Sequence, residues 1–316
     1  MPDPKLILEA IAAAGLTAAA VLLLCAGLWR SPRPKLASAG SVVGLSLGMF
    51  IGCWWIGLRP HWPPQEDQDR LLFLLLPILA GIELVAAVAG RSGWLVWLLR
   101  FGIAASAAPI LLYHSSYLTD LAGPGTREWT PTQTWMILGG LAAALAGVWM
   151  ALVLLARRIA PAAEPGKSKG HSVLFAVAIA VAGAAITIML SGYASGGEIG
   201  LPLAAALAGI VAASLALRQP FPGEGALSLG IVGLFALLVI GRFFGQLATA
   251  HGALLFFGLL LCWLPELPRG LARVVLVTVP VAVALALAQH KFAEDSGRTS
   301  SGAPEPSIQD YLDFGK

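Results

Sequence analysis

Ionisable side chains inside long apolar segments are the residues of this sequence most able to do chemistry. Glu83 lies deep in one such segment and Arg100 lies in the next, roughly equally far from the polar joint at Arg91. At a helical rise of about 1.5 Å per residue, both lie about 10–13 Å from that edge. Because unpaired charges are costly in a bilayer, we predict that Glu83 and Arg100 form an ion pair between adjacent antiparallel helices. The pair could be a structural staple, or Glu83 could take part in transport or gating.

A second predicted pair joins Glu9 and Arg242. Each lies about one helical turn or slightly more inside the membrane boundary on the side away from the Arg91 joint. The two segments are nevertheless far apart in the sequence. Structural pairing and independent extension of each side chain to the membrane surface both fit this depth. Glycines at 241 and 245 flank Arg242, and they could let a solute or a neighbouring helix approach the backbone.

The loops on the same side as Arg242 hold a candidate polar cluster of His114, Tyr117 and Asp120. Histidines and acids can bind a divalent cation or act as acid and base. However, no pair has the spacing of a zinc-binding motif or of a paired-carboxylate motif, and solvated loops explain these residues more simply. The three cysteines lie far apart inside apolar segments, where they pack as small hydrophobic residues. We therefore expect no catalytic residue, no cofactor and no metal site.

Ten apolar segments, each about as long as a bilayer is thick, occupy the chain between Leu6 and Gln289. They cover approximately residues 6–29, 37–58, 71–90, 94–116, 134–156, 172–192, 199–217, 226–247, 250–265 and 271–290. Mean hydropathy is +0.81 and only 12% of residues are charged, against about 25% in soluble domains. This predicts an all-α, polytopic transmembrane helical bundle of about ten helices. The ninth segment is short and could re-enter the membrane instead, so eight or nine spans stay open.

Orientation follows from Lys and Arg, which concentrate on one set of alternate joints and most densely from Arg157 to Lys169. Since cytoplasmic loops carry the excess of these residues, that face is predicted to be cytoplasmic and both termini non-cytoplasmic. The chain has 14 Arg, 6 Lys and no Asn. This composition suggests a GC-rich bacterial genome, and hence the bacterial cytoplasmic membrane as the location.

The chain divides into a transmembrane domain over 1–290 and a polar tail over 291–316. The tail is rich in Pro, Gly and Ser, which predicts disorder. The net charge of +3 without a long basic run argues against nucleic acid as a partner. The expected partners are the lipid bilayer, a small solute, and a protein that binds the outer loops or the tail.

Two nine-residue stretches are nearly the same: Gly139-Gly-Leu-Ala-Ala-Ala-Leu-Ala-Gly147 and Leu201-Pro-Leu-Ala-Ala-Ala-Leu-Ala-Gly209. Small residues four positions apart, such as Gly139, Ala143 and Gly147, favour close packing of membrane helices. Similar stretches are common in Ala- and Leu-rich chains, and these two do not establish an internal repeat.

Three functions are compatible with these features. The first is a secondary transporter or permease-like protein for an unidentified solute, favoured by the segment count, the buried charges and the prolines inside helices. Transport predicts a mid-membrane cavity lined by Pro77 or Pro109 and by at least one of Glu83, Tyr117 or Arg242. The alternatives are a non-catalytic membrane scaffold or complex subunit, and an intramembrane enzyme acting on a lipid-linked substrate. The lack of a catalytic motif makes an enzyme the weaker interpretation.

Overall fold

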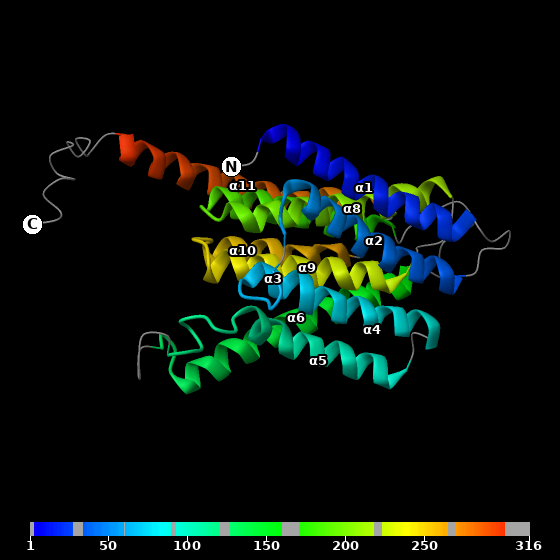
Figure 1. Cartoon of the computed structure of the whole chain (residues 1–316), viewed down its shortest axis with the longest axis horizontal. Coiled ribbons are helices and arrows are strands. Elements are labelled where there is room, and N and C mark those ends of the chain that lie inside the picture. The colour runs from blue at the N-terminus through cyan, green and yellow to red at the C-terminus, as the bar shows by residue number, and fades with distance from the viewer. Residues whose placement is uncertain are drawn as a thin grey trace, which may run out of the picture.

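The structure is a computed structural model that describes residues 3–27, 34–59, 61–89, 93–120, 127–159, 171–217, 223–264 and 270–300. Over these ranges the chain is helical with no strand, and the helices run roughly along one axis (Figure 1). The elements are α1 (Pro4–Gly27), α2 (Pro34–Ile56), α3 (Asp67–Arg70), a π-helical turn η1 (Leu71–Leu75), α4 (Leu76–Ala89), α5 (Trp94–Leu111), α6 (Pro131–Ile159), α7 (His171–Leu190), α8 (Ala194–Ala216), α9 (Glu224–Phe243), α10 (Thr249–Phe257), a 3-10 helix η2 (Gly258–Trp263) and α11 (Gly270–Ser300).

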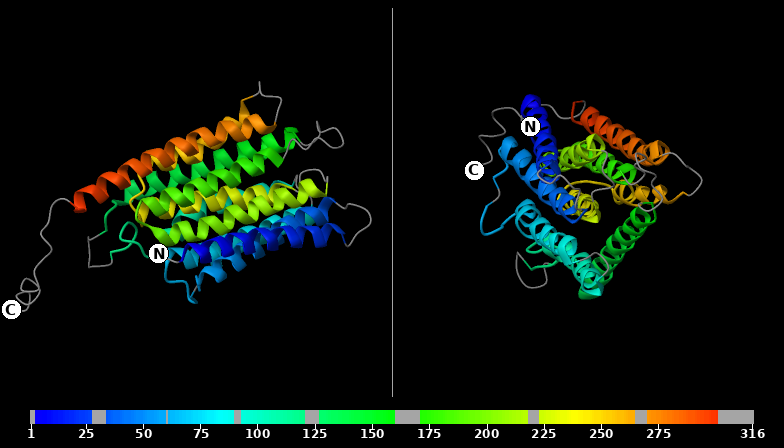
Figure 2. Two further views of the ribbon diagram at one scale, coloured as in Figure 1. Left: turned by 90° about the horizontal axis from the view of Figure 1, so that it is seen from above. Right: turned by 90° about the vertical axis from the view of Figure 1, so that its right-hand side faces the viewer.

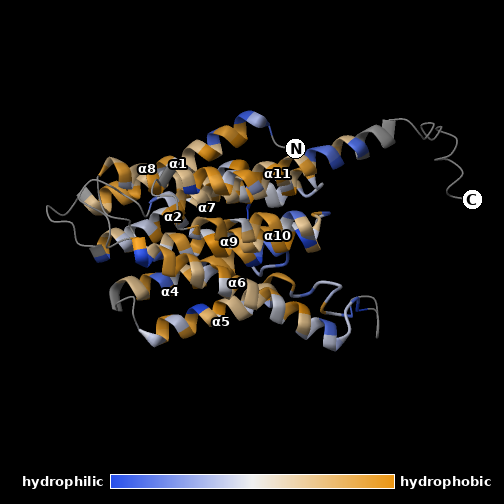
Figure 3. Ribbon diagram, turned by 180° about the vertical axis from the view of Figure 1, so that it is seen from behind, coloured by the Kyte–Doolittle hydropathy of each residue, from blue (hydrophilic) through white to orange (hydrophobic). Residues whose placement is uncertain are grey.

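Nine helices in the described ranges are long and apolar enough to cross a membrane, and the segment Thr249–Trp263 is a shorter apolar helix. Figure 3 shows hydrophobic residues along most of the length of these helices. The prediction of an all-α, polytopic transmembrane bundle is therefore confirmed. The protein is a multi-pass membrane protein, because helices this apolar and this long are solvated by lipid or by one another.

Helix α9 forms the centre of the bundle. Every residue from Glu224 to Gly241 is buried, and α9 packs against α2, α4, α5, α6, α7, α8 and α10. The view along the helices in Figure 2 shows the others arranged around it. A helix that is apolar on all sides belongs in such a position, whereas α1, α6 and α11 bury only part of their surface and lie at the periphery.

The short ninth segment crosses the bundle from one end to the other. Thr249, at its start, contacts Arg242, and Trp263, at its end, lies 5.5 Å from the guanidinium of Arg158. Its α-helical part rises about 1.5 Å per residue and its 3-10 part about 2 Å per residue. The whole segment therefore reaches about 25 Å, close to the thickness of a bilayer core. As a result, the start of α1 and the end of α11 lie at the same end of the bundle (Figure 1). We call the two ends the Arg157 end and the Arg242 end.

Helices α1 and α8 approach so closely that only glycine fits between them. A Cβ atom added at Gly209 would lie 2.2 Å from the carbonyl oxygen of Gly15. The glycines of α6 behave differently, and the expectation that they permit close packing is wrong. A Cβ added at Gly139 or Gly147 would meet no described atom within 4 Å, because this face of α6 points away from the bundle.

Helix α11 continues to Ser300, although the polar tail was expected to begin at residue 291. The sequence from Lys291 to Asp295 contains mostly good helix formers, and extending an existing helix avoids the cost of starting a new one. The last turns of α11 project beyond the neighbouring helices (Figure 1). Residues 301–316 of the predicted tail lie outside the described ranges.

Candidate functional site

The Arg157 end contains a network of four charged side chains, of which Glu83, Arg100 and Glu224 are buried and Arg157 is half-buried. Arg100 on α5 donates to both carboxylate oxygens of Glu83 on α4, at 2.8 and 2.7 Å. It also donates to Glu224 at the start of α9, at 3.2 Å. Arg157 on α6 donates to the same Glu224 at 2.6 and 2.9 Å. The structure thus brings the predicted pair of Glu83 and Arg100 together and adds a second pair to it.

Burial makes this network costly unless it stays complete. Arg100 and Glu83 are each 2% exposed and Glu224 is 6% exposed, so water screens these charges little. Two guanidinium groups and two carboxylates balance, which leaves no uncompensated charge among them. Buried charges of this kind are tolerated only when each one is paired and hydrogen-bonded. The network therefore joins α4, α5, α6 and α9 at this end.

Aromatic rings and a glycine help to position the two arginines. Trp97 lies beside both guanidinium groups, 5.3 Å from that of Arg100 and 5.4 Å from that of Arg157. Trp149 is 5.9 Å from Arg100, and its indole N–H donates to Ser228 at 2.9 Å. Such ring contacts stabilise a desolvated cation. Next to Glu224, Gly225 allows α2 and α4 to come close, since an added Cβ there would clash with the Val42 side chain and would lie 3.3 Å from the Cβ of Glu83.

Sequence reasoning missed Glu224 and Arg157. Arg157 was assigned to the cytoplasmic joint, and Glu224 was not singled out because it lies just before an apolar segment and 124 residues from Arg100. A sequence signal did exist, since Glu224 is the only carboxylate between Glu198 and Glu266. An isolated acid at the boundary of a very apolar helix favours pairing with a cation at the same depth.

The predicted pair of Glu9 and Arg242 does not form, and this expectation is corrected. Glu9 accepts a hydrogen bond from the Trp55 indole at 3.2 Å and lies 3.9 Å from the Lys5 ammonium. Arg242 instead donates to the Thr249 hydroxyl at 2.8 Å. Equal depth was the only argument for contact, but α1 packs on α2 and α8 at the periphery while α9 is central.

The polar residues His114, Tyr117 and Asp120 do not form a joint site. The Tyr117 hydroxyl donates to the carbonyl oxygen of Phe243 at 3.2 Å, and Asp120 accepts the backbone N–H of Arg127 at 2.8 Å. His114 adopts a left-handed backbone with φ of 56°. In the part of the chain that the structure describes, no group of three or more His, Cys, Asp or Glu residues could hold a metal ion.

Sequence reasoning also missed a buried polar turn at the Arg242 end. The side chain of Asp69 accepts three backbone N–H groups, from His61, Gln65 and Glu66, at 3.1 to 3.3 Å. Arg70 donates to the carbonyl oxygens of Leu111 and Tyr113 at the end of α5. These bonds satisfy the charges of both side chains locally, so the turn closes the space between α3 and α5 and serves a structural role.

Tyr193 connects this turn to the joint between α7 and α8. Its hydroxyl donates to the Asp67 carboxylate at 2.8 Å, and the Gln68 amide donates to the hydroxyl oxygen at 3.4 Å. Burial of the phenol, together with the negative charge of Asp67, raises the pKa of Tyr193 to about 12. The protonated donor is therefore the form that the fold favours.

We expect the absorbance of tyrosinate, measured as the difference between the wild-type protein and Tyr193→Phe, to rise with a midpoint near pH 12 and not near pH ~10, the usual value. Because the folded pKa lies above the unfolded one, the stabilisation is complete below about pH 10 and is lost as the pH rises toward 12. Over that window the stability of the wild type should fall more steeply than that of the variant. A midpoint near 10 would contradict the buried hydrogen bond.

A cavity of about 700 Å³ lies between α6, α9 and α10. Its walls are apolar over two turns of α6, from Met136 to Ala144, which corresponds to about 12 Å. Arg242 and Glu128 line it at the Arg242 end. The cavity therefore occupies the half of the bundle opposite the buried charge network. Tyr117 and Arg242 line it, as expected of a transport cavity, whereas neither Pro77 nor Pro109 does, so the expected position next to these prolines is corrected.

Three aromatic rings form one wall of this cavity. Tyr117 packs against Trp129 at 4.9 Å and against Phe243 at 5.3 Å, and Trp129 packs against Phe243 at 5.3 Å. Next to the rings, Arg242 donates its Nε–H to the Thr249 hydroxyl. The other N–H groups of its guanidinium are therefore available to a ligand. The Glu128 carboxylate accepts the Ser116 hydroxyl at 2.6 Å. The site thus combines an apolar interior with one group of each charge.

Comparison of the sequence with models of known protein families finds no match, and neither does comparison with curated proteins. The charge network and the cavity are therefore the features that point to a function.

Proposed function

We propose that the protein is a permease-like transporter for a small amphipathic solute that binds in the cavity between α6, α9 and α10. The observation that carries the proposal is the composition of this cavity. Apolar walls extend to membrane depth, while Arg242 and Glu128 line the same space at one end. A volume of about 700 Å³ is within the range of small-molecule sites, which are mostly apolar with a few placed polar groups.

The distribution of closed and hollow regions supports transport over simple binding. The Arg157 end is held by the network of Glu83, Arg100, Arg157 and Glu224, and the cavity lies at the other end. Alternating access needs one end closed while the other admits the solute. With the Arg157 end cytoplasmic, as the Lys and Arg distribution predicts, this arrangement corresponds to an outward-facing state.

The polar groups favour a solute with a zwitterionic head. An arginine guanidinium binds carboxylate and phosphate oxygens through parallel N–H donors. Glu128 adds a countercharge that a cationic group on the solute would satisfy. An apolar body would then lie along the ring wall of Tyr117, Trp129 and Phe243.

Binding is tested with the full chain in phosphatidylcholine nanodiscs and three fluorescent octyl amphiphiles that differ only in their head. The heads are a phosphocholine zwitterion, a sulfate and a trimethylammonium. We expect the zwitterion to bind best and Arg242→Gln to weaken it about tenfold, the value of one charge-assisted hydrogen bond. The exposed Arg59, which lies over Trp54 outside the cavity, provides the control Arg59→Gln, which should leave binding unchanged.

A second pair of variants tests the cavity without changing a charged residue, because one of them fills the cavity and the other does not. Gly140 lines the cavity and Gly147 lies further along the same helix outside it, and an added Cβ meets no described atom within 4 Å at either position. Gly140→Trp should abolish binding, whereas Gly147→Trp should not. Equal behaviour of the two variants would remove this cavity as the site.

Uptake into proteoliposomes then distinguishes transport from binding alone. The wild type should accumulate the zwitterionic amphiphile inside the vesicle faster than protein-free liposomes, and Gly140→Trp should not. Binding without uptake would overturn the transport proposal and favour a scaffold or subunit that uses the cavity to hold a ligand.

A further inference from the structure

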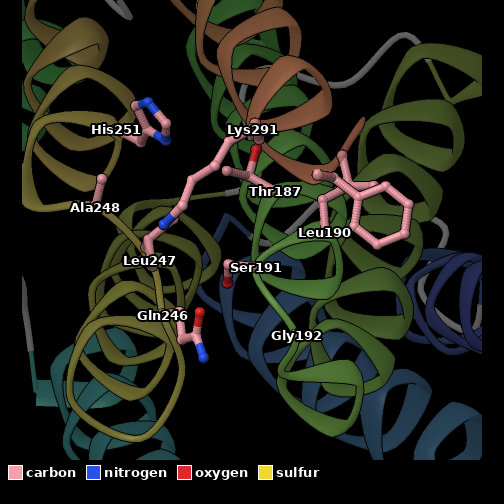
Figure 4. Close-up of a pocket in the computed structure, with 11 residues that line it drawn as sticks. Thr187, Leu190, Ser191, Gly192, Gln246, Leu247, Ala248, His251 and Lys291 are labelled. Atoms are coloured by element: carbon pink, nitrogen blue, oxygen red, sulfur yellow. The ribbon is translucent and has the colours of Figure 1, made fainter. Parts of the chain in front are cut away.

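A second, smaller cavity of about 200 Å³ lies between α7, α10 and α11 at the Arg242 end (Figure 4). The loop between α9 and α10 separates it from the larger cavity, and Ala248 lines both. Its polar lining consists of Thr187, Ser191, Gln246, His251 and Lys291, and no carboxylate lines it. The lining can therefore carry positive charge but no negative charge.

The direction of the Lys291 side chain is the most informative feature of this cavity. Lys291 is exposed and lies near the projecting end of α11, where its ammonium group could extend into water. In Figure 4 the side chain instead runs from α11 toward Leu247, and Ser191 and Gln246 lie beyond its end in this view. On the same helix, the Glu294 carboxylate lies 3.5 Å from His290. The Lys291 ammonium thus points into a cavity that no carboxylate lines.

The hydrogen-bond donors of the cavity suit an oxyanion. The Lys291 ammonium and the Gln246 amide carry several N–H groups, and the His251 ring carries at least one. The Thr187 and Ser191 hydroxyls donate to backbone carbonyl oxygens at 2.7 Å each, so they contribute little to anion binding. A volume of about 200 Å³ holds a phosphate group together with several waters.

The neighbouring surface of α11 indicates where such a phosphate would come from. Val279, Val283 and Leu287 are 57%, 44% and 49% exposed, which marks the face of α11 that contacts lipid. Ala288 and Lys291 follow directly and line the cavity. A cation one turn beyond the apolar face of a membrane helix lies at the depth of the lipid headgroups, where Lys side chains commonly extend.

We infer that the cavity between α7, α10 and α11 binds the phosphate of a phospholipid headgroup, with Lys291 as the principal cation and His251 and Gln246 as further donors. This site is separate from the solute cavity, and the inference does not depend on the transport proposal. The bound lipid would contact α7, α10 and α11 together, and so would stabilise the α9–α10 joint that both cavities share.

The test measures lipid retention by native mass spectrometry. The full chain is taken from nanodiscs that contain equal amounts of phosphatidylglycerol and a diacyl glycolipid without phosphate, and is then delipidated stepwise in detergent. The wild type should keep a phosphatidylglycerol molecule after the glycolipid is lost. Lys291→Gln should reduce this retention about tenfold, and Lys291→Arg should restore it. Lys5→Gln, which alters an 80% exposed lysine side chain at the same end, serves as the matched control.

A second arm separates lipid phosphate from free phosphate. The melting temperature of the detergent-solubilised protein is measured with inorganic phosphate and with phosphatidylglycerol. Stabilisation by the lipid that Lys291→Gln removes supports the inference. Stabilisation by inorganic phosphate alone overturns the lipid assignment and identifies a soluble anion site. Equal retention of both lipids, or equal loss in Lys291→Gln and Lys5→Gln, overturns the site altogether.

Discussion

Arg100→Gln is expected to lower the free energy of unfolding by about 3–5 kcal/mol, the usual cost of breaking a buried ion pair. The variant leaves the carboxylates of Glu83 and Glu224 with only the Arg157 guanidinium in the network. The double variant Glu83→Gln with Arg100→Gln should lower the free energy of unfolding by less than the two single variants do in sum. It removes one charge of each sign and leaves the pair of Glu224 and Arg157 complete. Reversible unfolding in mixed micelles measures these differences.

The control for this cycle is Arg59→Gln, because the Arg59 guanidinium lies over the exposed Trp54 ring at the opposite end of the bundle. Its effect should be within about 0.5 kcal/mol, as is usual for surface substitutions. Strictly additive losses for the Glu83 and Arg100 variants would mean that the two charges do not interact energetically. The network could then not be what holds the Arg157 end closed.

Gly209→Ala and Gly147→Ala should change stability in opposite directions. At Gly209 the new Cβ would lie 2.2 Å from a backbone oxygen of Gly15, so α1 and α8 must separate, and overpacking of this kind costs about 1–3 kcal/mol. At Gly147 the Cβ would meet no described atom within 4 Å. There the higher helix propensity of alanine should stabilise by up to about 1 kcal/mol.

The same unfolding assay measures this pair, and each variant is a control for the other because both make the same chemical change in an α-helix. A loss at Gly147 as large as that at Gly209 would contradict the lipid-facing position of this part of α6. No loss at Gly209 would contradict the close contact of α1 and α8, and would mean that this contact can relax without cost.

The pairing of Glu83 with Arg100 could be predicted because it depends on local chain geometry. The two residues lie on consecutive antiparallel helices, roughly equally far from the joint that connects them, and a short joint keeps such helices adjacent. Depth along the helix is then nearly sufficient to define a contact. Burial in an apolar segment supplied the energetic reason for pairing.

Depth did not predict the partners of Glu9 and Arg242, because it does not determine which helices are neighbours. Arg242 lies on the central helix and Glu9 on a peripheral one, and each found a partner nearer to it. The addition of Glu224 to the network has the same origin. Its contact with Arg100 depends on α9 lying against α4 and α5, and across a separation of 124 positions no local feature of the chain encodes that arrangement.

The sequence by itself determined that this chain forms apolar helices that cross a membrane, because helix length and hydropathy are properties of each segment alone. The tertiary structure decided what each helix faces. The stretches ending at Gly147 and Gly209 share Leu-Ala-Ala-Ala-Leu-Ala-Gly and both are helical, yet one glycine is exposed and the other is buried against α1. Lipid and a neighbouring helix are equally apolar surroundings, so hydrophobicity does not distinguish them. Only shape complementarity and the pairing of the few charges select among the arrangements, and both arise when distant segments meet.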